Sequence, residues 1–108
     1  MNKMSYQKQM EIFQQMLPIF NVLNDENRQK IILLLAANET TGLSVTDITK
    51  ELHLSRPAVS HHLKLLKQAD VISYRKEGVE HLYYLTLKAS VDLMKQLVEA
   101  LEAQCDLI

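Results

Sequence analysis

The chain contains few residues that interrupt helices and strands or that form disulfide bonds. Its 108 residues include only two Gly, two Pro and one Cys. The scarcity of Gly and Pro favours helices joined by few turns. Because Cys105 stands alone, an intrachain disulfide is excluded, and we expect a reducing, cytoplasmic setting. A chain of this length is expected to form one ordinary globular domain.

Long apolar runs and catalytic arrangements are also missing. The longest unbroken apolar run extends from Ile31 to Ala37, far short of the roughly 20 residues that cross a membrane. Residues 1–13 lack the apolar stretch of a signal peptide. The sequence shows neither a paired nucleophile and base nor a Gly-rich phosphate loop. We therefore expect no membrane association and no enzyme activity.

Charge is present but unevenly distributed. The net charge is −1, yet the segment from Ser55 to Lys76 carries five cationic side chains and one acidic side chain. The five cations are Arg56, Lys64, Lys67, Arg75 and Lys76. From Glu77 to the end, two cations stand against six acidic residues. A basic segment of this kind is either a phosphate-binding face or a solvated helix surface.

The first part of the chain predicts two helices and a loop. Apolar residues of the first helix recur at helical spacing. They are Tyr6, Met10, Phe13 and Leu17. Pro18 is expected to kink this helix or to end it near Leu17. Asp25 has the features of an N-cap for a second helix, which ends near Ala37 before a polar loop over residues 38–42.

Residues 44–69 have the pattern of a helix-turn-helix. Ser44 and Asp47 have the spacing of a capping box that begins a short helix. After a turn at His53, Ser55 is placed to cap a second helix with Pro57 in its first turn. At about 100° per residue, this helix has one apolar side. Its members are Val59, Leu63 and Leu66. The opposite side is polar and cationic, and such a face can fit a major groove.

Residues 71–86 predict a β-hairpin, and the rest predicts a final helix. Val71–Lys76 and His81–Thr86 are rich in Val, Ile, Tyr and Thr, and Glu77 and Gly78 are expected to form the turn between them. From Lys88 onward, apolar residues recur at near-heptad spacing. They are Met94, Leu97, Leu101, Cys105 and Ile108.

These segments carry a family resemblance. The chain resembles the ArsR/SmtB family of bacterial winged-helix repressors through LNDENRQKIILLL, LSRPAVSHHLKLLKQADVI and RKEGVEHLYYL. The resemblance implies a mainly α fold with a small β-hairpin: a winged helix-turn-helix with five helices in a single domain, 1–108. It places the helix-turn-helix at 44–69, the wing at 71–86 and dimerisation helices at 1–20 and 88–108. Asp70 stands where many relatives have Gly, but Asp also adopts the left-handed conformation.

The resemblance also implies a homodimer built from the first and last helices. Their apolar stripes agree, because they hold more apolar surface than a monomer of this size easily covers, although they could simply close its own core. The expected interface residues are Tyr6, Met10, Phe13, Met94, Leu97, Leu101 and Cys105. Two copies of the reading helix would recognise a palindrome with half-sites about one DNA turn, roughly 34–36 Å, apart or a multiple of that.

Relatives often release DNA when a metal or an oxidant binds, but the ligand positions are mostly missing here. One family site needs a Cys-x-Cys that residues 44–54 lack. At the other, only Asp92 is retained, and Met94, Cys105 and Ile108 replace the His, His and Glu ligands. A remodelled soft-metal site of Asp92, Met94 and Cys105 is the alternative to ordinary packing. We expect no metal and no cofactor, and leave open an unknown small inducer.

Two further alternatives remain at this stage. Cys105 could be a redox switch, although it has no partner Cys, and Glu102 and Asp106 would oppose its thiolate. The chain could also be a winged-helix module that binds proteins and has lost DNA binding.

The favoured hypothesis is a dimeric repressor that binds double-stranded DNA. Thr46 and Lys67 are assigned to phosphates, and Arg75 and Lys76 to the flanking backbone or minor groove. His61 is the expected groove reader, whereas His62 is expected to pack or to face a phosphate. His53 is expected to be structural, and His81 to pair across the hairpin. The expected DNA contacts are Thr46, Ser55, Arg56, Ser60, His61, Lys64, Lys67, Arg75 and Lys76.

Overall fold

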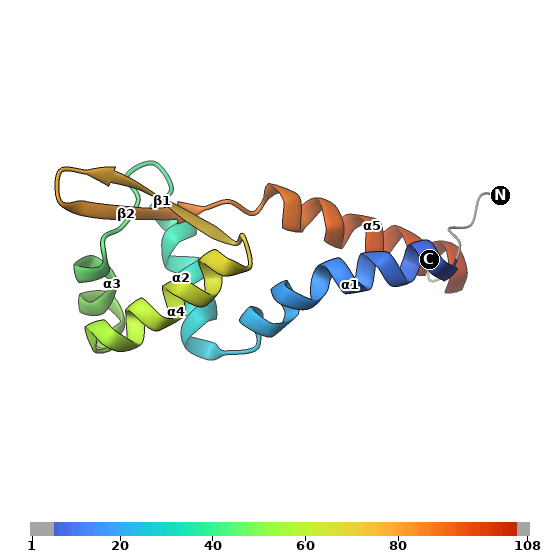
Figure 1. Ribbon diagram of the computed structural model, residues 1–108, viewed down its shortest axis with the longest axis horizontal. Coiled ribbons are helices and arrows are strands. Elements are labelled where there is room, and N and C mark those ends of the chain that lie inside the picture. Colours follow the sequence, from blue (N-terminus) through green and yellow to red (C-terminus); the bar gives the residue numbers. More distant parts are fainter. Residues whose placement is uncertain (1–5, 106–108) are drawn as a thin grey trace.

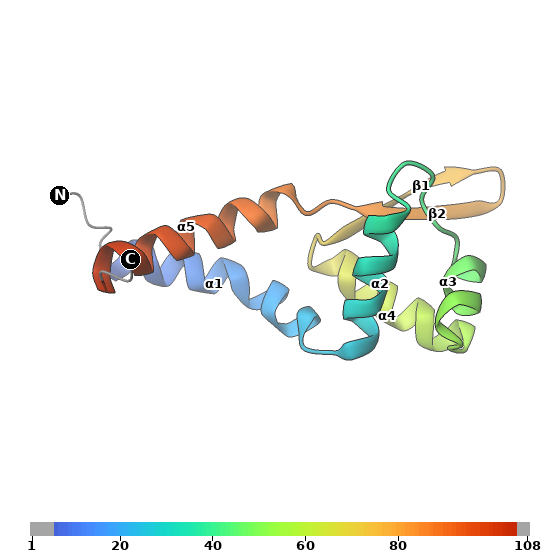
Figure 2. The ribbon, with the colours of Figure 1, turned by 180° about the vertical axis from the view of Figure 1, so that it is seen from behind.

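The computed structural model describes residues 6–105 and has an elongated shape. Its elements are α1 (Tyr6–Leu23), α2 (Glu26–Ala37), α3 (Val45–Leu52), α4 (Arg56–Gln68), β1 (Ile72–Glu77), β2 (Glu80–Leu85) and α5 (Lys88–Cys105). The helices α1 and α5 run side by side at one end, and all other elements gather at the opposite end (Figures 1 and 2). The molecule measures 53 × 23 × 23 Å. This arrangement confirms the predicted five helices and antiparallel hairpin.

Local side-chain chemistry explains where the helices begin and end. The Asp25 side chain accepts a hydrogen bond from the Arg28 N–H, and the Ser55 side chain accepts one from Ala58, so both predicted N-caps are confirmed. The capping box is also confirmed, because Ser44 and Asp47 bond to each other's backbone N–H at 3.1 and 3.0 Å. After α4, Asp70 adopts the left-handed conformation with φ 59°.

Two local expectations are corrected by the structure. Of the two outcomes expected at Pro18, an end of the first helix near Leu17 is wrong, because α1 continues through Pro18 to Leu23. Met16 and Ile19 lie on either side of the proline and are both buried, so tertiary packing holds the helix together where the proline removes one hydrogen bond. The hairpin turn is formed by Gly78 and Val79, one residue later than expected, because Glu77 pairs with Glu80.

Two separate cores hold the two ends. One core joins α2, α3, α4 and the hairpin, and six of its members on these three helices are at most 1 % exposed. They are Ile31, Leu35, Ile48, Val59, Leu63 and Leu66. The second core is smaller and lies between α1 and α5, where Ile12, Met16 and Ile19 pack against Leu93 and Leu97. The first core fixes α4 by its apolar side and leaves the other side free.

Candidate nucleic-acid interface

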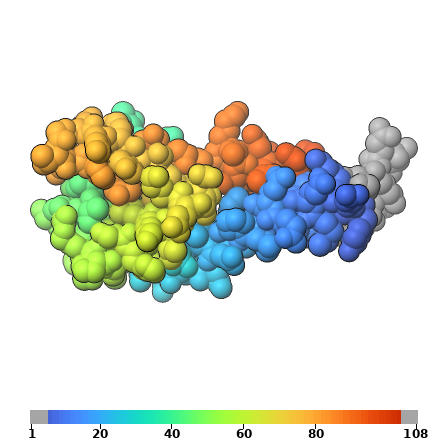
Figure 3. Space-filling model, in the orientation of Figure 1, coloured from blue at the N-terminus to red at the C-terminus, as the bar shows by residue number. Residues whose placement is uncertain are grey.

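The outward side of α4 carries most of the predicted contact residues. All the predicted residues from its N-cap to its last turn have exposed side chains: Ser55, Arg56, Ser60, His61, Lys64 and Lys67. The inward residue Leu63 is 1 % exposed, so burial determines which side faces outward. In the space-filling view, α4 lies below the hairpin on one face of the molecule (Figure 3). The structure thus brings a polar, cationic helix surface next to the wing.

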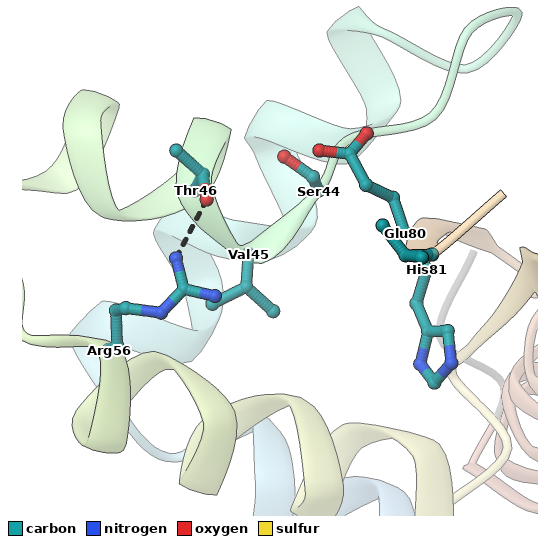
Figure 4. Close-up of a pocket in the computed structure, with 7 residues that line it drawn as sticks. Ser44, Val45, Thr46, Arg56, Glu80 and His81 are labelled. Atoms are coloured by element: carbon teal, nitrogen blue, oxygen red, sulfur yellow. Dashed lines mark hydrogen bonds between the residues drawn. The ribbon is translucent and has the colours of Figure 1, made fainter. Parts of the chain in front are cut away.

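A hollow of about 220 Å³ lies between the start of α3, the start of α4 and the tip of the wing. Arg56 Nη1 donates a 2.7 Å hydrogen bond to Thr46 Oγ1, which joins two of the predicted contact residues. His81 and Glu80 face the hollow from the hairpin side (Figure 4). The hollow therefore brings residues of α3, α4 and the wing together, and it contains one carboxylate among its cationic and polar groups.

Aromatic rings connect the hairpin to the end of α4. His81 stacks on Tyr74, with ring centroids 4.2 Å apart and planes 12° apart. Lys67 Nζ lies 5.5 Å from the centre of the Tyr74 ring, within the range of a cation–π contact. Burial raises the pKa of Tyr83, which contacts Tyr74 on the same face of the hairpin. Sequence reasoning missed this stack, since His81 and Tyr74 are not direct cross-strand partners.

The two predicted wing cations have different surroundings. Lys76 is exposed beside the stacked face, opposite His81 in the strand register. Arg75 points to the other face, because successive strand residues alternate. Its Nη2 donates to the Thr41 carbonyl at 2.7 Å, and its Nε lies 3.3 Å from Glu77 Oε1. Arg75 thus anchors the hairpin to the loop between α2 and α3, a role the sequence did not indicate.

A polar cluster lies behind α4, where α1 meets α2. His62 has only 14 % of its side chain exposed, and its Nδ1 lies 3.3 Å from Arg28 Nη1 and 4.0 Å from Asp25 Oδ2. Burial lowers the pKa of His62, an effect that Asp25 opposes and Arg28 reinforces. The Arg28 backbone N–H lowers the pKa of Asp25 by its hydrogen bond. Of the two alternatives for His62, the structure shows the packed one, but its partner Arg28 had not been singled out.

The residues predicted at a dimer interface form two groups. Tyr6, Met10, Phe13 and Leu101 are exposed, as a free interface would require. Met94 and Leu97 are half-buried against α1 of the same chain, so they also help to close the monomer core. The α1 stripe continues beyond the prediction through Leu17 and Phe20, both exposed. The Cys105 side chain lies outside the part that the structure describes.

The hypothetical soft-metal site is not assembled from the described side chains. Asp92 is exposed and Met94 is half-buried on α5, and Cys105 and Ile108 fall outside the described side chains. Within residues 6–103, no group of three or more His, Cys, Asp or Glu side chains is placed to bind a metal ion. None of the described helices combines the length and apolarity needed to cross a membrane.

Comparison with known proteins gives a consistent set of relatives. A family described as "Bacterial regulatory protein, arsR family" matches residues 25–74. An uncharacterized helix-turn-helix transcriptional regulator of Methanocaldococcus jannaschii is 38 % identical over 76 residues, covering 70 % of this chain and 83 % of that protein. The transcriptional repressor SdpR of Bacillus subtilis is 39 % identical over 66 residues, covering 61 % and 69 %.

Solved structures show the same arrangement of elements. An ArsR-like transcriptional regulator from a Rhodococcus species aligns with a TM-score of 0.77 at 24 % identity, covering 90 % of this chain and 85 % of that one. Reduced HlyU from Vibrio cholerae aligns with a TM-score of 0.68 at 23 % identity, covering 92 % and 98 %. At these identities, the likeness concerns the fold.

Proposed function

Because the chain belongs to the ArsR family of bacterial regulatory proteins, we propose that it represses transcription as a homodimer bound to a palindromic operator. Family membership makes it a DNA-binding transcriptional regulator and not an enzyme. One observation carries the assignment of the surface: α4 is buried by its apolar side, and its exposed side offers hydroxyl, imidazole and ammonium groups. We place its site of action in the cytoplasm, where the operator lies.

In this proposal, α4 enters the major groove. Ser60 and His61 are short or planar polar side chains on the exposed side of α4, near its middle, where base edges come within reach. Lys64 and Lys67 extend toward the phosphates on either side of the groove. Arg56 and Thr46 lie together at the start of α4 and α3 and contact the backbone as a hydrogen-bonded pair.

The wing extends the contact along the flanking DNA. Lys76 is an exposed cation of the wing, and His81 lies opposite it with its ring stacked on Tyr74. Arg75 contributes by holding the hairpin in place through Thr41, and its half-exposed guanidinium keeps the predicted reach to the backbone. This division assigns the main phosphate contact to Lys76 on the stacked face, and a contact with the flanking backbone to Arg75 on the other face.

The proposed homodimer is supported by apolar residues that the second, smaller core leaves uncovered. The pair α1 and α5 covers only one side of each helix, and a continuous stripe on α1 stays exposed. The stripe consists of Tyr6, Met10, Phe13, Leu17 and Phe20. Large exposed apolar patches on soluble proteins commonly mark protein interfaces. We propose that a second copy of this chain covers the stripe, because a dimer with two-fold symmetry is suited to binding a palindromic operator.

Replacing Lys64 tests the DNA-binding face directly. Fluorescence anisotropy with a duplex from the chain's own promoter and with a random duplex, each at several salt concentrations, should show tighter and salt-dependent binding to the first. Lys64→Ala should weaken binding to both duplexes and reduce the salt slope by about one unit, because one phosphate contact is lost.

Lys30→Ala is the matched control, since Lys30 is an exposed lysine on α2, paired with Glu26. It should bind like the wild type. An unchanged slope and affinity for Lys64→Ala would remove Lys64 from the contact set. Equal, salt-independent binding of the wild type to both duplexes would contradict the proposed function itself.

A further inference from the structure

The joint between α1 and α2 is closed by one arginine. The α1 helix ends at Leu23 and α2 begins at Glu26, so the chain turns within two residues. The last carbonyl groups of a helix have no partner within it. Arg28 supplies partners for two of them: its Nε donates to the Val22 carbonyl at 2.7 Å, and its Nη2 donates to the Asn21 carbonyl at 3.4 Å.

The same guanidinium reaches the reading helix. Arg28 Nη1 lies 3.3 Å from His62 Nδ1, on the inward side of α4 and 34 residues away in sequence. Because guanidinium groups only donate hydrogen bonds, His62 Nδ1 must be the acceptor, which places the imidazole proton on Nε2. Asp25 Oδ2, 4.0 Å from the same nitrogen, completes the cluster. One rigid, planar group therefore contacts the end of α1 and the middle of α4 at once.

Gln29 also lies at this joint, but within residues 6–105 its side chain makes no hydrogen bond to α4. Gln29 Nε2 donates to the Leu23 carbonyl at 2.8 Å, so it also caps α1. Arg28 and Gln29 thus share one role, the capping of α1, and differ in the other, the link to α4. This difference allows the two roles to be separated experimentally.

We propose that Arg28 is a positioning residue that fixes the angle between the dimerisation helix α1 and the reading helix α4, and thereby sets the half-site spacing that the dimer accepts. The inference rests on the proposed homodimer. In a two-fold dimer, the distance between the two copies of α4 depends on how each is held relative to α1. A planar guanidinium with several donors constrains this angle in a way that a lysine, a single flexible ammonium, does not.

In vitro selection from a random-sequence duplex library tests the proposal. The wild type should select paired half-sites at one spacing. Arg28→Lys should select the same half-site sequence but accept neighbouring spacings, with affinity for the wild-type spacing reduced by about tenfold, as expected for lost hydrogen bonds to a charged group. His62→Ala removes the α4 end of the link and should broaden the spacing in the same way.

Gln29→Ala is the matched control, because it removes only an α1 capping bond. It should keep the wild-type spacing. Circular dichroism confirms that each variant is folded at the selection temperature, and loss of stability alone would lower affinity without changing the preferred spacing. An unchanged single spacing in both Arg28→Lys and His62→Ala, or equal broadening in Gln29→Ala, would overturn the inference. Selection of unpaired half-sites by the wild type would instead overturn the proposed dimeric function.

Discussion

His61 and His62 are adjacent in sequence but serve different surroundings. Successive residues of a helix point about 100° apart, so His61 is exposed on the outward side of α4, whereas His62 packs against Arg28 and Asp25. The periodicity of apolar residues predicted this division correctly. It could not reveal Arg28 as the partner, because that contact joins positions 34 residues apart and depends on how α2 packs against α4.

His62 should make stability sensitive to mild acid. Burial holds its pKa in the folded state below the ordinary value of 6.5. As the pH falls below that value, the unfolded chain takes up a proton that the folded chain does not, so the free energy of unfolding decreases. We expect His62→Gln to show a weaker loss of stability between pH 7 and pH 5, measured by urea unfolding.

His61→Gln provides the comparison, since it changes the exposed neighbour and leaves the buried ring in place. It should follow the wild type over the same pH range. The Asp25 carboxyl, whose pKa is lowered by the Arg28 N–H, loses its contribution only as the pH falls below about 3.8, which separates the two groups. Parallel pH profiles for His62→Gln and the wild type would contradict this assignment.

At the scale of elements, the local sequence predicted where helices begin better than where they end. Ser44 and Ser55 cap their helices as expected, because capping depends on side chains within three residues. Pro18 does not end α1, because burial of Met16 and Ile19 overrides the local preference. The orientation of Arg75 toward Thr41 was also beyond local reasoning, since it follows from the way the hairpin rests on a distant loop.

The hairpin is basic along its strands and acidic at its tip. Glu77 and Glu80 flank the two-residue turn, and the Val79 side chain between them is fully exposed. Glu80 also faces the hollow that contains Arg56 (Figure 4). These carboxylates would repel DNA phosphates, so the proposal assigns contact to the strands and not to the tip.

Glu80→Gln should therefore strengthen DNA binding. Removing one exposed repulsive charge is expected to raise affinity for promoter and random duplexes alike by up to roughly fivefold, because exposed charges interact by about 0.2–1 kcal/mol. Anisotropy titrations at low and high salt measure the effect, which should shrink as salt increases. Glu39→Gln, in the exposed loop after α2, is the control and should have no effect. Weaker binding by Glu80→Gln would place this carboxylate in a productive contact.

At the scale of the whole molecule, the proposed DNA-binding elements and the proposed dimer helices occupy opposite ends (Figure 1). The sequence indicated both functions but not their separation over a length of 53 Å. It also could not divide the apolar residues of α5 between the monomer core and the interface. Met94 and Leu97 contribute to the core, whereas Val98 and Leu101 remain exposed.

Phe13→Lys should convert the proposed dimer to a monomer. Phe13 is 36 % exposed in the middle of the α1 stripe, so a lysine is tolerated by the single chain but places a charge inside a dimer interface. Size-exclusion chromatography with light scattering should give twice the chain mass for the wild type and the chain mass for the variant.

Leu33→Lys provides the control for this substitution. Leu33 is 69 % exposed on α2, away from the stripe, and its replacement should leave the dimer intact. A wild type that is monomeric at micromolar concentration, or a Phe13→Lys variant that stays dimeric, would remove this stripe as the interface.

The pair α1 and α5 forms an elongated arm that extends from the compact part containing α2, α3, α4 and the hairpin. In a long body, a rotation at one point displaces distant atoms in proportion to their distance from it. The α1–α2 joint lies between this arm and the compact part. A small change in the angle at the joint therefore displaces the far end of the arm by a much larger distance. In the proposed dimer, an effector bound along the arm would therefore need to change the angle at Arg28 only slightly to move the two copies of α4 out of register with their half-sites.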